Sequence, residues 1–211
     1  MKHTLSAAIL TLALTSPAIA QEGNAKVHVR METSLGAIVL EMYPDKAPKT
    51  VENFVQYVND GYFSDTIFHR VISSFMIQGG GFTPQYKKKL TRAPIANEAD
   101  NMLPNERGTI AMARTAHPDS ATAQFFINVE NNVALNHSGK TSSRAWGYAV
   151  FGRVVEGMET VDAIRAVETG PAGPFRSDAP REMVIIQGAT VIADYAPSTE
   201  VEQAPDGTES S

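Results

Sequence analysis

The pattern of apolar and polar residues predicts that the chain starts with a β-hairpin. Apolar and polar residues alternate over residues 27–33 and again over 37–42, and Ser34, Leu35 and Gly36 separate the two runs. This pattern is typical of two half-buried antiparallel strands joined by a short turn. Later strand-like runs, with turn-rich loops between them, lie at residues 68–72, 75–79, 108–113, 125–129, 148–154 and 184–192.

Two segments have helical periodicity instead. Residues 46–60 place apolar side chains on one stripe, with Pro48 near the start and Gly61 just after the end, as expected at helix boundaries. The stripe is formed by Val51, Phe54, Val55 and Val58. Residues 158–167 predict a second helix. Because the order of elements is not a series of βαβ units, it predicts a mainly β fold, a closed and largely antiparallel barrel with helices covering its ends.

The stretch FHRVISSFMIQGGGF carries polar side chains in strands that would otherwise be buried. Side chains alternate between the two faces of a strand, so Arg70 shares a face with Phe68, and Gln78 shares one with Met76. Two interpretations follow. In the first, Arg70 covers apolar surface or pairs with a carboxylate, and Gln78 satisfies a loop carbonyl. In the second, both side chains face a binding groove.

The first residues, MKHTLSAAILTLALTSPAIA, predict a secretory signal peptide over residues 1–20. Lys2 gives a positive start, residues 5–14 form an apolar run, and Ala18 and Ala20 form an A-x-A cleavage site. A membrane anchor is the alternative, but the apolar run is too short to span a bilayer. We therefore expect an exported protein that is cleaved after Ala20.

Composition narrows the classes of function. The chain has 211 residues, of which 43% are hydrophobic and 19% charged, and this suits one compact domain. It has no cysteine, which excludes a disulfide framework and a thiol nucleophile. A formal net charge of −5 argues against nucleic-acid or anionic-membrane partners. Residues 196–211 are polar and acidic without periodicity, and we predict that this tail is disordered.

Motifs of the common catalytic classes are absent. The sequence contains no G-x-S-x-G elbow, Walker loop, H-E-x-x-H or C-x-x-C, and its histidines lack metal-ligand spacing, so we expect no metal or cofactor. Alternation allows only one of Phe125 and Phe126 to face the core, which leaves the other for a pocket. The remaining candidates for a binding surface are Arg70, Phe75, Met76, Gln78, Gln124, Phe126 and Leu135.

Several long segments carry a family resemblance: APKTVENFVQYVNDGYF, FHRVISSFMIQGGGF, GTIAMAR, AQFFINV and YAVFGRVVEGMETVDAI. In this order they resemble the first helix, the central signature, two groove-forming strands and the run into the second helix of the cyclophilins, which are peptidyl-prolyl cis-trans isomerases. The resemblance covers residues 29–191. The segments FMIQGGGFT and RGTIAMAR are most similar to exported bacterial members, which implies the periplasm as the compartment.

The resemblance implies a fold, an activity and a set of site residues. The implied fold is a closed eight-stranded antiparallel β-barrel capped by two α-helices, over residues 27–195. The implied activity is isomerisation of X-Pro bonds in proline-containing polypeptides, including unfolded exported proteins, without metal or cofactor. Arg70 is implied as the catalytic residue, and Ala113 and Arg114 are implied to offer backbone groups to the peptide. The implied substrate-binding residues are Phe75, Met76, Gln78, Ala113, Arg114, Gln124, Phe126, Leu135 and Tyr148.

The chain departs from the family pattern at three places. Many cyclophilins have a tryptophan that binds cyclosporin where this chain has Ala134, so we expect weak cyclosporin binding. Tyr148 stands where many members have a histidine; it keeps a ring and adds a hydroxyl group. The loop of residues 136–145 is long, and we expect it to bring Trp146 close to the edge of the groove.

Two other classes of function stay open at this point. The same groove would serve a peptide-binding module or chaperone whose turnover is incidental, and a structural envelope protein is a third class. The presence of Arg70 together with the complete set of pocket residues favours the interpretation as an enzyme, because a binding module does not need this arginine. We expect a monomer, without nucleic-acid or membrane partners, that assists proline-limited folding.

Overall fold

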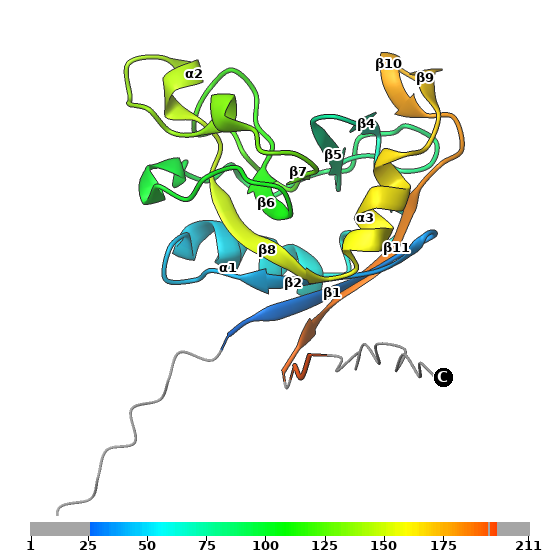
Figure 1. The fold of residues 1–211 in the computed structure, drawn as a ribbon, viewed down its shortest axis with the longest axis horizontal. Coiled ribbons are helices and arrows are strands. Elements are labelled where there is room, and N and C mark those ends of the chain that lie inside the picture. Colours follow the sequence, from blue (N-terminus) through cyan, green and yellow to red (C-terminus); the bar gives the residue numbers. More distant parts are fainter. Residues whose placement is uncertain (1–25, 194, 198–211) are drawn as a thin grey trace, which may run out of the picture.

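The computed structural model describes residues 26–193 and 195–197, which form two antiparallel sheets (Figure 1). The strands of the larger sheet are β1 (His28–Thr33), β2 (Gly36–Met42), β3 (Thr66–Ile67), β4 (Arg70–Ile72), β5 (Met76–Gly79), β6 (Thr109–Met112), β7 (Phe125–Asn128), β8 (Val150–Glu156) and β11 (Ile185–Ile192). The smaller sheet is a hairpin of β9 (Thr169–Ala172) and β10 (Phe175–Pro180). The predicted signal peptide, residues 1–20, lies outside the described residues, as does most of the predicted tail, residues 196–211.

The larger sheet is strongly curled. Its nine strands have the order β3-β11-β1-β2-β8-β6-β7-β5-β4, and every pairing is antiparallel. The end strands β3 and β4 are separated in the chain only by Phe68 and His69, so the curl returns nearly to its start. The predicted mainly β, antiparallel class is confirmed. The described sheet has nine strands where eight were expected, and no ladder within it joins β3 to β4.

The predicted first helix is α1 (Pro48–Asn59), and it buries its apolar stripe, with Phe54 fully buried. No side chain of its own caps the helix. Instead, the backbone N–H groups of Lys49 and Thr50 donate to the carboxylate of Glu98 at 3.1 and 2.8 Å. A distant carboxylate therefore satisfies N–H groups that have no partner inside the helix.

The predicted second helix is α3 (Met158–Arg165), which packs its buried side against the sheet. The structure adds three short helical turns that the periodicity did not predict. They are η1 (Ala99–Asn101), η2 (Val133–Leu135) and α2 (Ser143–Trp146). Single turns are too short to show a 3.6-residue pattern in a sequence.

Buried apolar side chains form two separate clusters. The large cluster fills the inside of the curled sheet and includes Phe125, which is fully buried. The small cluster consists of Met76, Ala111, Phe126 and Val150. Consecutive residues of β7 point to opposite faces, so the prediction that only one of the two phenylalanines joins the core is confirmed. The small cluster leaves an apolar surface outside the main core.

The hairpin β9-β10 is absent from the sequence-based expectations. Its strands read TGPA and FRSDAP, and residues such as glycine and proline are depleted in strands and common in turns. The hairpin packs against β4 and buries Ala179 and Pro180. Tertiary packing therefore outweighs the local preference.

No helix among the described residues is both long and apolar enough to cross a membrane.

Candidate active site

A pocket of about 120 Å³ opens over the small apolar cluster. It is lined by Arg70, Phe75, Met76, Gln78, Ala113, Arg114, Phe126, Leu135 and Tyr148. All predicted site residues except Gln124 are in this lining. They come from segments far apart in the sequence, and the strand order β6-β7-β5-β4 brings them together.

Phe126 forms the floor of the pocket. It lies opposite Gln78 of β5 and Ala111 of β6 in the ladders, and its side chain is only 4% exposed. The ring of Tyr148 meets it edge-on, with 5.6 Å between centroids, which is a favoured aromatic arrangement. The floor therefore offers an apolar surface suited to a small apolar ring.

Arg70 lies at the side of the pocket, opposite Gln78 across the β4-β5 ladder. Its guanidinium group donates no hydrogen bond to another described residue. Among the described residues, Arg70 forms one ion pair, with Asp178. The distance from Nε to Oδ2 of Asp178 is 3.8 Å, which is too long for a hydrogen bond. With 42% of the side chain exposed, the donors of Arg70 are available to a ligand in the pocket.

Gln78 is oriented by a second amide. Its Nε2 donates to Oε1 of Gln124 at 3.0 Å, so Gln124 supports the pocket without lining it. Gly81 makes room for this arrangement, because a Cβ atom at Gly81 would lie 2.5–2.7 Å from the Gln124 side chain. A glycine at position 81 therefore leaves space for the paired amides.

Arg114 differs from Arg70, although both line the pocket. Its guanidinium group donates to the carbonyl oxygens of Thr115, Ser143 and Gly147 and to the Ser143 hydroxyl, at 2.7–3.0 Å. Its cation also lies 4.4 Å from the ring centroid of Tyr148. Five N–H donors are the full capacity of an arginine, so this side chain anchors the loop with α2 beside the pocket.

One of the two backbone groups of Ala113 is already used within the protein. Its backbone N–H donates to the carbonyl of Gln124 at 2.9 Å, so a bound peptide would have only the Ala113 carbonyl to use. The family resemblance predicted that the backbone of Arg114 binds the peptide, but it did not predict the hydrogen bonds of the Arg114 side chain. Those bonds depend on a loop that follows much later in the chain.

The loop that Arg114 anchors folds tightly onto η2. Gly147 has a φ of +69°, and a Cβ atom there would lie 2.6–2.7 Å from His137 N and Leu135 O. The next residue, Tyr148, donates its N–H to the Leu135 carbonyl at 2.9 Å. A glycine is therefore needed for the close approach that places Leu135 and Tyr148 at the pocket.

Trp146 lies in this loop but does not line the pocket. Its ring contacts His137, with 5.7 Å between centroids, and Lys140 Nζ lies 4.7 Å from its centroid. Ala134 is exposed in η2 and is also outside the pocket lining. The tryptophan thus packs within its own loop.

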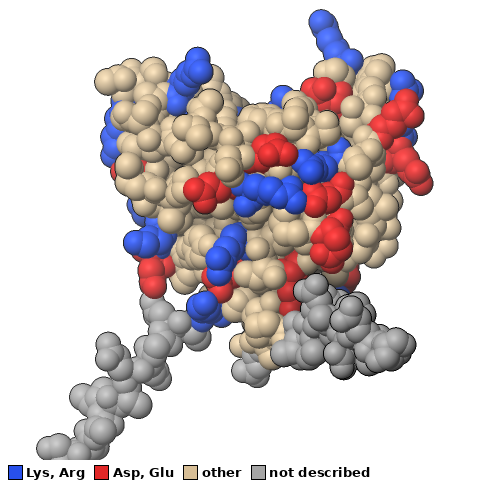
Figure 2. Space-filling view, viewed as in Figure 1, with Lys and Arg blue, Asp and Glu red and all other residues tan. Residues whose placement is uncertain are grey.

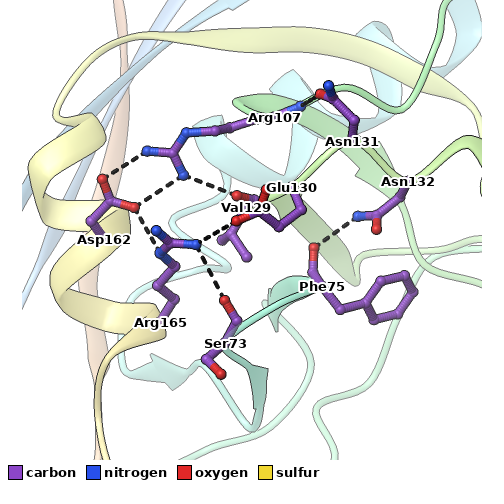
Figure 3. A network of polar contacts seen from close by, with 9 residues as sticks. All are labelled: Ser73, Phe75, Arg107, Val129, Glu130, Asn131, Asn132, Asp162 and Arg165. Carbon is purple, nitrogen blue, oxygen red and sulfur yellow. Dashed lines mark hydrogen bonds and ion pairs between the residues drawn. The ribbon is translucent and has the colours of Figure 1, made fainter.

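The backbone of Phe75 is held by hydrogen bonds from the segment that follows β7 (Figure 3). Its carbonyl oxygen accepts hydrogen bonds from the side-chain amide of Asn132 at 2.8 Å and from the backbone N–H of Val129 at 3.1 Å. Asn132 also donates to the side-chain oxygen of Asn128 at 2.7 Å. The turn before β5 is therefore fixed to the end of β7.

Charged side chains of α3 extend this support (Figure 3). Arg165 donates to the carbonyl of Ser73 at 3.3 Å and pairs with Glu130 at 2.9 Å. Asp162 accepts two hydrogen bonds from Arg107, at 3.0 and 2.7 Å, and these bonds lower the pKa of Asp162. Sequence reasoning did not find this network, because its members lie in four separate segments.

His69 is a buried residue that directly precedes Arg70 in the chain. It is 3% exposed, and its Nδ1 atom has no hydrogen-bond partner among the described residues. Burial lowers the pKa of His69 from 6.5 to about 4, and the positive charge of Arg70 adds to this effect. The imidazole is therefore neutral at physiological pH and acts as part of the apolar support.

The described residues contain no group of three or more His, Asp or Glu side chains that could hold a metal ion. On the face drawn in Figure 2, acidic and basic side chains are interspersed, and neither sign forms a continuous patch. The pocket itself offers an apolar floor, the side-chain amide of Gln78 and the guanidinium group of Arg70.

Comparison with known proteins agrees with this geometry. The sequence profile of the family described as cyclophilin type peptidyl-prolyl cis-trans isomerase/CLD matches residues 28–191. The chain is 58% identical over 164 residues to peptidyl-prolyl cis-trans isomerase cyp18 of Streptomyces antibioticus, covering 78% of this chain and 98% of that protein. It is 49% identical over 191 residues to peptidyl-prolyl cis-trans isomerase A of Dickeya dadantii, covering 90% and 98%.

A solved structure of a cyclophilin has a similar fold. A cyclophilin type peptidyl-prolyl cis-trans isomerase of Cryptosporidium parvum, crystallised in the presence of the dipeptide Ala-Pro, superposes with a TM-score of 0.63. The two sequences are 25% identical, and the match covers 79% of this chain and 99% of that one.

Proposed function

The chain belongs to the cyclophilin-type family and is a peptidyl-prolyl cis-trans isomerase, and from this premise we propose that it acts on exported polypeptides by stabilising the twisted X-Pro amide electrostatically at Arg70. One observation carries the proposal. Arg114 uses all its donors on the protein, whereas Arg70 donates no hydrogen bond to another described residue.

The reaction needs no covalent chemistry. Rotation about a peptide bond interrupts its amide resonance, and the barrier is about 18–20 kcal/mol. The uncatalysed isomerisation of X-Pro bonds takes about tens to hundreds of seconds. Since about 1.4 kcal/mol corresponds to a tenfold change in rate, lowering the barrier by about 7 kcal/mol gives an acceleration on the order of 10⁵.

Arg70 supplies stabilisation that grows during the rotation. As the amide twists, the prolyl nitrogen becomes pyramidal and regains a lone pair that can accept a hydrogen bond. A guanidinium donor at this point binds the twisted state more strongly than either planar isomer, which is the condition for catalysis. Arginine keeps its charge at any working pH, and the apolar floor beside it strengthens the interaction by excluding water.

The rest of the pocket holds the substrate while the bond rotates. Phe126 and Met76 would pack against the proline ring, and both are almost fully buried. Gln78, held by Gln124, and the carbonyl of Ala113 would hold the peptide backbone beside it. Fixing both sides of the rotating bond removes the orientational freedom that otherwise opposes reaction.

The test compares Arg70→Ala with wild-type protein in an NMR exchange or protease-coupled assay on a short Ala-Pro peptide. We expect kcat/KM to fall by about tenfold or more, with the fold unchanged by circular dichroism. Arg92→Ala is the matched control, because Arg92 is similarly exposed and pairs with Asp60 away from the pocket. Arg70→Lys keeps the charge but loses the planar fork, so we expect it to restore little activity.

Each outcome of this assay has a distinct meaning. Wild-type turnover by folded Arg70→Ala protein would remove Arg70 from the mechanism. A loss of turnover in the Arg92→Ala control equal to that in Arg70→Ala would point to a general effect of removing surface charge.

Export is supported by the sequence of residues 1–20, with its positive start, apolar run and A-x-A site. Expression of the full chain in a bacterium, followed by fractionation and N-terminal sequencing, tests it. We expect mature protein beginning at Gln21 in the periplasmic fraction. Uncleaved protein in the cytoplasm would contradict the proposal.

Weak cyclosporin binding is part of the same proposal. Ala134 is exposed on η2, next to Leu135 of the pocket, and it offers only a methyl group to a large apolar ligand. We expect Ala134→Trp to raise the affinity for cyclosporin in a fluorescence titration. Equal affinities of wild type and variant would show that this position does not limit binding.

A further inference from the structure

The hairpin β9-β10 packs beside the strand that carries Arg70 (Figure 1). Phe175, at the start of β10, stacks on His69 with 5.2 Å between ring centroids and meets Phe82 edge-on at 5.1 Å. His69 is buried and directly precedes Arg70. These ring contacts fix the hairpin against the segment that carries the catalytic arginine.

Asp178 lies on this hairpin where its carboxylate reaches Arg70. The β9-β10 register shifts between Phe175 and Ala179, and Asp178 has a φ of +62°, a left-handed conformation that aspartate tolerates better than most residues. Irregularities of this kind redirect a side chain, often next to an active site. Here Oδ2 of Asp178 lies 3.8 Å from Nε of Arg70.

This contact restrains the guanidinium group without occupying it. The carboxylate approaches Nε, so the two Nη groups remain available, and the distance exceeds that of a hydrogen bond. Arg70 lines the pocket, whereas Asp178 is not among the lining residues. The side chains are 42% and 35% exposed, and ion pairs this exposed contribute little to stability.

We propose that Asp178 is a positioning residue for Arg70, whose carboxylate orients the guanidinium group so that its Nη donors face the prolyl nitrogen of the twisted amide. This inference rests on the proposed electrostatic role of Arg70. Donors that are already oriented need no reorganisation during the reaction, whereas an unrestrained arginine loses rotamer freedom in the transition state. Asp178 therefore acts on kcat and leaves substrate binding nearly unchanged.

Asp178→Asn is the decisive variant, because asparagine keeps the shape and tolerates the same left-handed conformation. We expect kcat/KM on an Ala-Pro peptide to fall by about threefold to tenfold, with the loss in kcat and little change in KM. Glu168→Gln is the matched control. It removes an ion pair with Arg181, 2.8 Å long, at the base of the same hairpin, and it should leave kcat unchanged.

A double variant separates positioning from a merely structural role. In an Arg70→Ala background, Asp178→Asn should cause no further loss, because there is no guanidinium group left to orient. An equal loss in both backgrounds would overturn the inference. Asp178→Gly, which also suits a positive φ, should repeat the effect of Asp178→Asn with an unchanged melting temperature.

The Nε–H signal of Arg70 in a ¹H–¹⁵N spectrum gives a readout independent of turnover. We expect Asp178→Asn to shift or broaden this signal and Glu168→Gln to leave it in place. If Arg70→Ala is slow while Asp178→Asn matches wild type in kcat and in this signal, the positioning role alone fails. If Arg70→Ala turns over like wild type, the proposed function of Arg70 fails first.

Discussion

The pocket is lined by two arginines, and they differ in how many hydrogen bonds their guanidinium groups donate to the protein. Arg114 donates its five hydrogen bonds to Thr115, Ser143 and Gly147. Arg70 has the single long contact with Asp178 among the described residues. The same residue type therefore closes one side of the pocket and leaves donors open on the other.

The difference teaches that the partners of a side chain, and not its type or its place in a pocket, decide whether it serves structure or chemistry. A saturated guanidinium group stabilises the loop that holds it, because removing it leaves carbonyl oxygens without donors. An unsaturated one next to an apolar floor can stabilise charge that develops on a substrate. Four variants test this division, from the largest expected effect to the smallest.

Removing the floor that both sides share should have the largest effect. Phe126 is 4% exposed, so we expect Phe126→Ala to lower the free energy of unfolding by about 3–5 kcal/mol and to raise KM. Urea unfolding and peptide kinetics measure the two effects. Phe126→Leu, which stays apolar, should lose less of both. An unchanged unfolding curve for Phe126→Ala would show that the ring does not support the pocket.

The stability contributed by His69, next to Arg70 in the chain, should depend on pH. Burial lowers the pKa of His69 to about 4, below its ordinary value of 6.5, so the unfolded chain binds the proton more readily. The stability due to neutral His69 is complete above pH 6.5 and is lost as the pH falls towards 4, by about 3 kcal/mol in total.

Urea unfolding of wild type and His69→Gln between pH 7 and pH 4 tests this dependence. The stability difference between the two proteins should shrink as the pH falls. A constant difference for His69→Gln would contradict a buried neutral imidazole.

Removing the Arg114 side chain should lower the stability of the fold more than it lowers kcat. Arg114→Ala removes four hydrogen bonds to the loop and one to the Thr115 carbonyl. We expect a loss of about 2 kcal/mol in the free energy of unfolding, a higher KM and little change in kcat. Arg114→Lys should lie between wild type and Arg114→Ala. Full stability combined with a collapse of kcat would assign Arg114 to the chemistry and reverse the comparison.

The open side should show the smallest effect on stability. Arg70 contributes one long ion pair with a half-exposed partner, so Arg70→Ala should change the free energy of unfolding by less than about 1 kcal/mol. A melt beside the kinetic assay measures this. A loss as large as that of Arg114→Ala would mean that Arg70 carries structure as well.

Local patterns predicted much of this molecule. Alternation placed the first hairpin and separated Phe125 from Phe126, and helical spacing placed α1 and α3. Each of these signals is a periodicity within one element. The hairpin β9-β10 gave no such signal, because its glycine and proline residues favour turns and its strands form only through packing against β4.

The sequence by itself determined the fold class and the family, because alternation and long family segments are properties of neighbouring residues. Only the tertiary structure decided which donors are used. The bonds of Arg114 to Gly147, the support of Gln78 by Gln124 and the approach of Asp178 to Arg70 join segments that the sheet order and the loop closures bring together. Hydrogen bonds and ion pairs depend on distances of a few ångströms, and no periodicity along the chain encodes such distances between remote segments.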